Sequence, residues 1–231
     1  MTDADLARRL AAVQERIAAA ARAAGRTADA VALLAVSKTH PAADVRAAYA
    51  LGQRAFGENR VQELVAKAPE LADLTELRWH MIGSLQTNKV RDLLCVPGFA
   101  LLHSLDRPKL AAALQRELAP AGRRLSVLLQ IHATDEPQKH GCPPQDAAAL
   151  LQFVGRECPA LQVEGLMGMG PLDGDPAPAF RRVAGLAAEL RAASGLPLPT
   201  LSLGMSGDLE VAVACGSTLV RIGTDVFGAR G

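Results

Sequence analysis

Short apolar runs alternate with amphipathic stretches along the chain. The first stretch, roughly Asp3 to Ala24, mixes charged residues with alanines and leucines and predicts an amphipathic helix. Eight runs rich in apolar residues follow it, and a helical pattern comes after each of the first seven. These runs predict β-strands at Val31–Lys38, Arg54–Glu58, Leu77–Gly83, Ala100–Leu105, Leu125–His132, Gln162–Met169, Pro199–Met205 and Thr218–Gly223.

The order of strands and helices predicts an α/β protein. Eight strands with helices between them and no long linker favour a single (β/α)8 TIM-type barrel over residues 1–231, with an extra N-terminal helix. An open, doubly wound sheet is the alternative, and it needs a glycine-rich phosphate-binding turn after its first strand. The chain reads Ser37-Lys38-Thr39-His40-Pro41 there, so we expect the barrel. Gly170–Pro178 predicts a loop after the sixth strand.

Length and charge exclude several classes of protein. A chain of 231 residues buries about 70% of its surface on folding, so its core needs no disulfide or metal ion. Its 25 basic and 24 acidic residues give a net charge of +1, without the basic excess that is typical of nucleic-acid binding. Five phenylalanines, one tryptophan and one tyrosine offer few rings on which bases could stack. We therefore expect no nucleic-acid partner.

The sequence also indicates a cytoplasmic protein. No stretch approaches about 18 uninterrupted apolar residues, so we expect no membrane span. The charged residues of the first stretch do not have the basic-then-apolar order of a secretory signal. Four cysteines lie far apart and predict reduced, mostly buried thiols, namely Cys95, Cys142, Cys158 and Cys215.

Lys38 is the first candidate for chemistry, because barrel active sites lie at the C-terminal ends of the strands. It closes the apolar run that begins at Val31. One interpretation is a surface lysine whose ammonium group extends into solvent. The other is a partly desolvated lysine at the barrel mouth, whose lowered pKa frees the amine to form a Schiff base with an aldehyde.

The last two strands are each followed by small residues and hydroxyl groups, where barrels commonly bind phosphate. After the seventh strand, Gly204–Asp208 opens a helix, and Ser206 is a candidate N-cap whose hydroxyl could also bind a phosphate oxygen. After the eighth strand come Gly223 and Thr224. Asp208 and Asp225 would repel a phosphate unless their carboxylates point away from it.

Arg221 is the third candidate. Alternation along the strand places it on the same face as Leu219 and Gly223. If Gly223 faces the mouth, Arg221 does as well, and an inward guanidinium must find an acceptor. An ion pair with an acid across the barrel is the purely structural alternative to a ligand site.

Several motifs occur in one order along nearly the whole chain and resemble those of the pyridoxal phosphate homeostasis proteins, relatives of the N-terminal domain of alanine racemase. The run Ala35-Val-Ser-Lys-Thr39 comes first. The remaining motifs are Phe56-Gly-Glu-Asn59 with Val61-Gln-Glu63, Trp79-His-Met-Ile-Gly83 with Leu85-Gln-Thr-Asn-Lys89, Leu203-Gly-Met-Ser-Gly-Asp208, and Gly216-Ser-Thr-Leu-Val-Arg-Ile-Gly-Thr224.

This resemblance implies a barrel that binds pyridoxal 5′-phosphate (PLP) as a Schiff base on Lys38. It further implies that Arg221 faces the pyridine nitrogen. By the same resemblance Ser206, Gly223 and Thr224 hold the phosphate, and Asn59 and His80 lie around the ring. No catalytic residue and no metal ligand follows from it.

The chain departs from the family pattern at a few positions. The family often has a second lysine where His40 stands, and Met81 and Ser84 replace commoner residues in their motif. Lys139, after the fifth strand, matches a family lysine of uncertain role.

The resemblance indicates a carrier of PLP in intracellular PLP homeostasis rather than an efficient enzyme, with PLP-dependent apo-enzymes as further partners to consider. A weak amino-acid racemase is the alternative. Racemases of this kind resemble the site in using an arginine at the pyridine nitrogen, but they take a tyrosine base from a second domain of a partner subunit. Here the chain ends at Gly231, just past the eighth strand, and its one tyrosine, Tyr49, is expected on a helix after the first strand. We therefore expect a monomer without efficient racemase turnover.

A metal-dependent hydrolase is an alternative from another class of protein. His80, His103 and His132 lie in or at the ends of three successive predicted strands and could meet at one mouth. No acidic ligand and no HxH pair accompanies them, so we expect no metal site.

Overall fold

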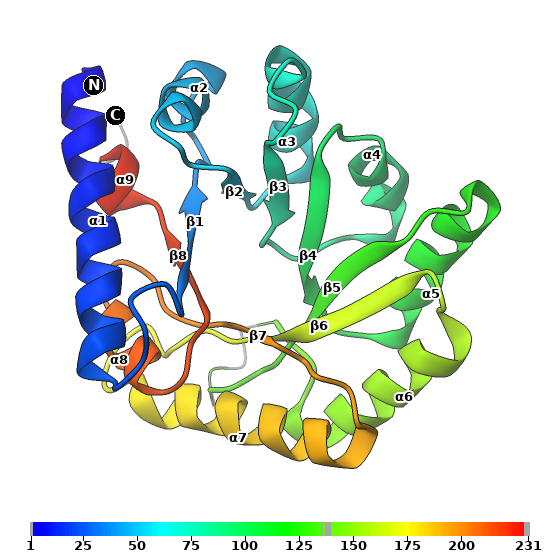
Figure 1. Cartoon of the computed structure of the whole chain (residues 1–231). Helices are drawn as coiled ribbons and strands as arrows, with labels where there is room; N and C mark the ends of the chain where they lie inside the picture. The colour runs from blue at the N-terminus through cyan, green and yellow to red at the C-terminus, as the bar shows by residue number, and fades with distance from the viewer. Residues whose placement is uncertain (1, 135, 137–139, 229–231) are drawn as a thin grey trace.

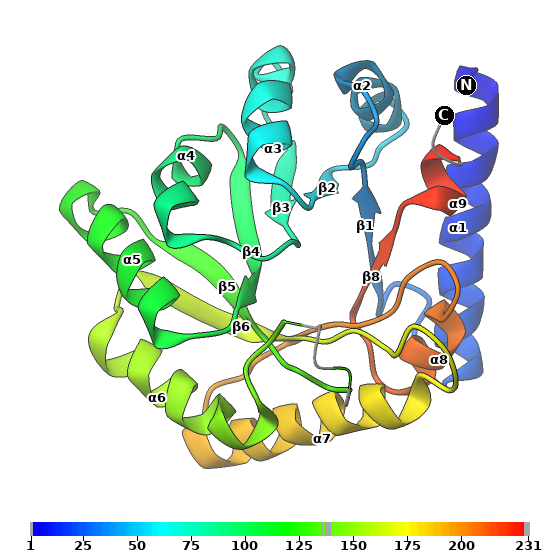
Figure 2. The same ribbon diagram turned by 180° about the vertical axis from the view of Figure 1, so that it is seen from behind.

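Eight parallel strands close into a barrel in which the spatial order follows the order along the chain. The computed structural model describes residues 2–134, 136 and 140–228. The first strand pairs with the second and also with the eighth, where Ala32 lies opposite Leu219 and Ala35 opposite Ile222. Figures 1 and 2 show the helices arranged around the outside. The predicted (β/α)8 barrel is confirmed.

The structure gives the bounds of each element (Figure 1). The strands are β1 Ala32–Val36, β2 Ala55–Glu58, β3 Arg78–Met81, β4 Phe99–Leu105, β5 Leu125–Gln130, β6 Leu161–Met167, β7 Thr200–Ser202 and β8 Leu219–Ile222. The α-helices are α1 Asp3–Ala23, α2 Ala42–Ala50, α3 Val61–Lys67, α4 Val90–Leu94, α5 Pro108–Leu118, α6 Ala147–Glu157, α7 Ala177–Ser194, α8 Leu209–Ala214 and α9 Thr224–Phe227. Short 3-10 helices occupy Ala68–Leu71, Thr87–Lys89, Ala119–Ala121 and Pro144–Asp146.

Every strand except β4 is shorter than the apolar run that predicted it. The first run was expected to reach Lys38, but β1 ends at Val36 because the chain turns there, and Thr39 has a φ of 68°. The loop after β6 is also shorter than expected, because α7 begins at Ala177 and includes Pro178 in its first turn, where a missing N–H costs nothing. The four-residue helix α9 was not expected.

Alternation along the strands separates a barrel interior from a layer between strands and helices. A Cβ at Gly57 of β2 would lie 3.1 Å from Leu34 and 3.5 Å from Val36, so these two side chains point toward the interior. Lys38 continues the same series beyond the end of β1. Ala35 and Ser37 belong to the opposite series and are fully buried between the strands and the helices.

The N-terminal helix α1 is confirmed and lies along α8 and α9 in both views (Figures 1 and 2). Its buried side chains recur every three or four residues, which is the spacing of one helix face. They are Leu6, Leu10, Val13, Ile17, Ala20 and Ala21. The helix therefore covers the outside of the barrel next to the loops that follow β7 and β8. None of the described helices is both long and apolar enough to cross a bilayer.

Candidate functional site

A cavity of about 230 Å³ opens at the C-terminal ends of β1, β7 and β8. This is the end of the barrel where the sequence predicted a ligand site. The cavity collects five of the predicted residues from segments far apart in the sequence. Those five are Lys38, Ser206, Arg221, Gly223 and Thr224, and the other lining residues are Val36, His40, Ile82, Met205, Gly207 and Gly228.

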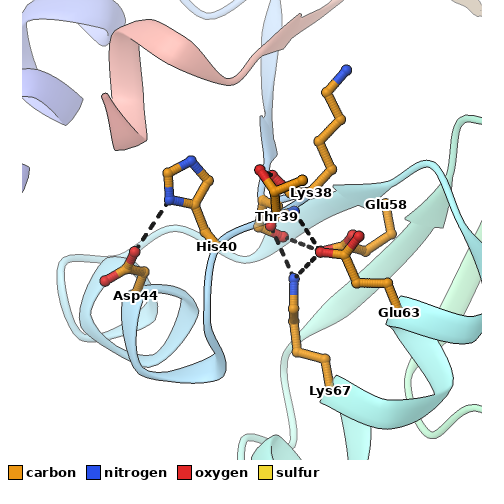
Figure 3. Close-up of polar contacts among 8 residues, drawn as sticks. Lys38, Thr39, His40, Asp44, Glu58, Glu63 and Lys67 are labelled. Atoms are coloured by element: carbon orange, nitrogen blue, oxygen red, sulfur yellow. Dashed lines mark hydrogen bonds and ion pairs between the residues drawn. The ribbon is translucent and has the colours of Figure 1, made fainter. Parts of the chain in front are cut away.

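Lys38 is half-buried in the wall of this cavity. Its side chain extends away from the carboxylates of Glu58 and Glu63 and from the ammonium group of Lys67, which lie behind it (Figure 3). Of the two interpretations of Lys38, the geometry therefore favours a lysine at the mouth that faces a pocket.

Arg221 is buried in the barrel, with 5% of its surface exposed. Its guanidinium donates to the carbonyl of Ser202 at 2.6 Å, to the Ser202 hydroxyl at 2.8 Å and to the carbonyl of Gly168 at 3.0 Å. These contacts use three of its five N–H donors and leave two that no described residue accepts. Burial lowers the pKa of Arg221 to about 10, so the side chain stays cationic at neutral pH. Its acceptors are not acids, so the purely structural ion pair is not what holds it.

A buried chain of hydrogen bonds leads from Arg221 to His80. The guanidinium can only donate, so the Ser202 hydroxyl accepts from it, and the same hydroxyl is hydrogen-bonded to His103 Nδ1 at 3.0 Å. His103 Nε2 is in turn hydrogen-bonded to His80 Nδ1 at 3.0 Å. Burial lowers the pKa of His80 to about 4 and that of His103 well below its ordinary value, so both rings are neutral at pH 7.

Two predicted residues do not line the cavity. His80 lies on β3 inside the barrel, where its Nδ1 is 3.0 Å from His103 Nε2 and the two rings pack together. Asn59 lines a separate cavity of about 360 Å³ together with Arg60, Lys89 and other residues from the segments that follow β2, β3, β4 and β5. The Asn59 carbonyl lies so close to Gly83 that a Cβ there would be 2.1 Å from its oxygen, so only glycine fits.

The two acids near the predicted phosphate loops, Asp208 and Asp225, each have a partner within the protein. Asp208 Oδ1 accepts from the backbone N–H of Met205 at 2.6 Å.

The predicted N-cap role of Ser206 is wrong, because α8 begins at Leu209 and the residue before it is Asp208. No described residue accepts from the backbone N–H groups of Ser206 and Gly207, which therefore resemble the donors of an anion site.

Arg16 was missed by the sequence analysis. It lies on α1 and donates to the carbonyl of Ser206 at 2.9 Å, while its other groups pair with Asp225 at 2.8 Å and with Glu210 at 2.5 Å. One side chain therefore ties the loop after β7 to the turn after β8 and neutralises Asp225. Arg16 and Ser206 lie 190 residues apart in the sequence, so no local pattern could have indicated their contact.

Some missed lining residues carried a signal in the sequence and others did not. Val36 and Ile82 lie two residues from Lys38 and His80, so the period of a strand places each on the same face as its predicted neighbour. His40 enters the cavity because its Nδ1 lies 3.3 Å from Asp44 and its ring packs 5.0 Å from that of Phe227. That placement depends on tertiary contacts.

The geometry gives no support to the metal-dependent hydrolase. Both nitrogens of His103 lie in hydrogen bonds, and His132 Nε2 contacts the carbonyl of Glu136 at 2.9 Å. Among the residues that the structure describes, no three His, Cys, Asp or Glu side chains are grouped to hold a metal ion. Lys139 lies outside the described residues.

Comparison with known proteins shows a close similarity over almost the entire chain. The family model for the N-terminal domain of alanine racemase matches residues 9–231. The pyridoxal phosphate homeostasis protein of Pseudomonas aeruginosa is 48% identical over 231 residues, which cover 97% of this chain and 96% of that protein. The protein of the same name in Escherichia coli K12 is 42% identical over 236 residues and covers 98% and 97%.

A solved structure with a bound ligand is similar as well. PipY of Synechococcus elongatus PCC7942, with PLP bound, superposes with a TM-score of 0.83 at 40% sequence identity. The match covers 96% of this chain and 100% of that chain.

Proposed function

We propose that this chain, which belongs to the pyridoxal phosphate homeostasis proteins of the alanine racemase N-terminal domain family, binds pyridoxal 5′-phosphate and holds it as a Schiff base on Lys38. The observation that carries the proposal is the convergence of Lys38, Arg221 and the loops after β7 and β8 on one cavity. A primary amine, a buried cation and two hydroxyl-bearing turns suit a phosphorylated aromatic aldehyde.

The residues present fit this cofactor. Lys38 Nζ would bond to the aldehyde carbon that PLP would supply, with loss of one water molecule. Arg221 has two N–H donors left for a ring acceptor and is cationic at neutral pH. The phosphate would be held by the hydroxyls of Ser206 and Thr224. The backbone N–H groups of Ser206 and Gly207, from which no described residue accepts, would hold it as well. A Cβ at position 223 would lie 3.1 Å from the carbonyl oxygen of Val36 and would crowd it. Glycine therefore keeps this part of the cavity wall open.

Replacing Lys38 tests the assignment. The wild-type protein with PLP should absorb in the near-ultraviolet to visible region, and borohydride should fix the cofactor to a peptide that contains Lys38. Lys38→Ala should abolish the reducible adduct, whereas Lys109→Ala, which removes an exposed lysine of α5, should leave it intact. An unchanged adduct in Lys38→Ala refutes the role of this lysine.

The cellular role that we propose is to carry and buffer PLP, as a cytoplasmic monomer that can pass the cofactor to PLP-dependent apo-enzymes. The names of the relatives support homeostasis. The placement of Tyr49 supports a carrier over a racemase, because its ring lies on α2 against Arg54, whose Cζ is 4.1 Å from the ring centre. Arg54 directly precedes β2, at the end of the barrel opposite the cavity.

A further inference from the structure

A buried cluster of charged side chains lies directly behind Lys38, between β1, β2 and α3 (Figure 3). Its members are Glu58 at the end of β2 and Glu63 and Lys67 on α3, and we call it the Lys67 cluster. Glu58 is completely buried and Lys67 is 6% exposed. The cluster lies on the outer side of the barrel wall, so it does not line the cavity that Lys38 faces.

The Lys67 ammonium group has three N–H donors, and each has an acceptor. It donates to Glu58 Oε1 at 2.5 Å, to the carbonyl of Ser37 at 2.9 Å and to Glu63 Oε1 at 3.1 Å. The Ser37 hydroxyl also donates to Glu58 Oε1, at 2.7 Å. The position of the ammonium group is therefore fully determined by its partners.

These contacts hold the peptide groups on both sides of Lys38. The carbonyl of Ser37, which belongs to the preceding peptide group, accepts from Lys67. The N–H of Thr39, which belongs to the following one, donates to Glu63 Oε1 at 2.5 Å. Thr39 is β-branched and has a φ of 68°, a conformation that strains such a residue and persists only where its surroundings enforce it.

Stability alone does not account for charges buried in this place. The desolvation of two buried ions largely offsets their attraction, and well-packed apolar residues often replace such pairs at no cost in stability. Burial raises the pKa of Glu58 in spite of Lys67, and no described group reaches its Oε2. The cluster therefore carries the energetic cost of buried charge. It also makes direct contacts with the backbone of the lysine that faces the cavity.

We propose that Glu58, Glu63 and Lys67 are positioning residues for Lys38. They fix the two peptide planes that flank its Cα, so that the amine enters the cavity from one direction. The proposal rests on the proposed function of Lys38 and extends it to a group of residues that do not touch the cofactor. A lysine held in advance loses less conformational freedom when it bonds, and preorganisation of this kind raises affinity without new contacts.

The first experiment alters Glu63, which is partly exposed and can change without opening the core. Glu63→Ala removes the acceptor for the Thr39 N–H, and PLP affinity by absorbance titration should fall about tenfold. Glu63→Gln keeps an oxygen acceptor and should restore most of the affinity. Glu76→Ala, which removes an exposed partner of Arg54 before β3, is the matched control and should bind PLP as the wild type does.

A second measurement reads the position of the backbone without cofactor. In the PLP-free protein, the Thr39 amide should exchange its hydrogen slowly in the wild type and in Glu63→Gln, and at least tenfold faster in Glu63→Ala. A residue that serves only general stability would change exchange across the barrel, not at this one amide.

The third experiment separates stability from positioning. The variant Ser37→Ala/Glu58→Leu/Lys67→Met fills the same space with apolar groups. It removes the Ser37 hydroxyl and the Glu58 carboxylate together with the Lys67 ammonium group, so none of these polar groups is left buried without a partner. Its urea midpoint should equal or exceed that of the wild type, while its PLP affinity should fall at least tenfold. If this variant does not fold, the Glu63 series decides the question alone.

The outcomes separate this proposal from the proposed function. If borohydride fixes the wild-type cofactor to a lysine other than Lys38, the function assigned to Lys38 fails. If the wild-type adduct maps to Lys38 but Glu63→Ala keeps wild-type PLP affinity and slow exchange at Thr39, the positioning role is overturned.

Discussion

Arg221 and the two histidines beyond it show how single residues set the chemistry of the barrel interior. Arg221 is cationic and donates only, so the Ser202 hydroxyl accepts from it, and hydrogen bonds continue from Ser202 through His103 to His80. Both rings are buried in the neutral form, since burial disfavours their charged state. The interior is therefore a polar network with one fixed positive charge.

Neutral buried histidines make stability depend on pH. The unfolded chain protonates its histidines near pH 6.5, whereas folded His80 does so only near 4 and His103 lower than its ordinary value. Below about pH 6.5 the unfolded state binds more protons than the folded state. The free energy of unfolding should therefore decrease as the pH is lowered, by up to about 1.4 kcal/mol per pH unit for each histidine. Urea unfolding between about pH 7 and pH 5, above the range where most carboxylates titrate, measures this slope.

Two variants control for other titrating groups. His103→Gln should reduce the pH dependence of unfolding, and His132→Gln, which changes a histidine outside the network, should keep it. A wild-type slope no steeper than that of His103→Gln contradicts the assignment of neutral rings.

Among the secondary-structure elements, α1 is the one that the barrel topology does not require. It packs against α8 and α9 and brings Arg16 to the loops that follow β7 and β8. By pairing with Asp225, Arg16 neutralises a carboxylate next to the proposed phosphate site. The helix therefore acts on the cavity as well as on the core.

Arg16→Ala should weaken PLP binding more than it weakens the fold. Its ion pairs are partly exposed and contribute at most about 1 kcal/mol to stability, so the urea midpoint should change little. PLP affinity should fall about tenfold, because Asp225 is left unpaired and the two loops lose their link. Fluorescence or absorbance titration with PLP measures the change. Arg8→Ala on the same helix, which breaks a surface pair with Asp5, should bind PLP normally, and equal effects of the two variants would contradict this role.

At the scale of the whole molecule, the parallel barrel assigns its two ends different tasks. All strands run in one direction, so the residues that follow them gather at one end and form the cavity. Tyr49 contacts Arg54 near the start of β2, at the other end. The cavity thus brings a lysine and a cation together, and its lining contains no tyrosine from the described part of the chain.

This arrangement predicts that the purified, PLP-loaded protein does not racemise alanine or serine efficiently. Two-base racemisation needs a second proton carrier on the face opposite the lysine, and a guanidinium at the ring nitrogen donates a hydrogen bond without giving up its proton. Chiral chromatography after prolonged incubation measures the turnover, with a dedicated alanine racemase as the positive control. Rates that match the control would overturn the carrier role.

The sequence by itself determined the fold and most of the cavity. The alternation of apolar runs and amphipathic stretches is a local property, and it predicted eight strands, the N-terminal helix and closure into a barrel. Because a parallel barrel gathers strand ends at one face, Lys38, Arg221 and the loops after β7 and β8 could be expected together. The strand period would also have supplied Val36 and Ile82.

Only the tertiary structure decided how these groups are held. Arg16 reaches its partners across most of the chain, and the Lys67 cluster depends on the direction in which α3 presents its side chains to β1. Asn59 lies in a separate cavity, and its carbonyl packs so closely against Gly83 that a Cβ there would not fit. Such contacts depend on distances of a few ångströms between segments remote in sequence, and periodicity carries no information about them.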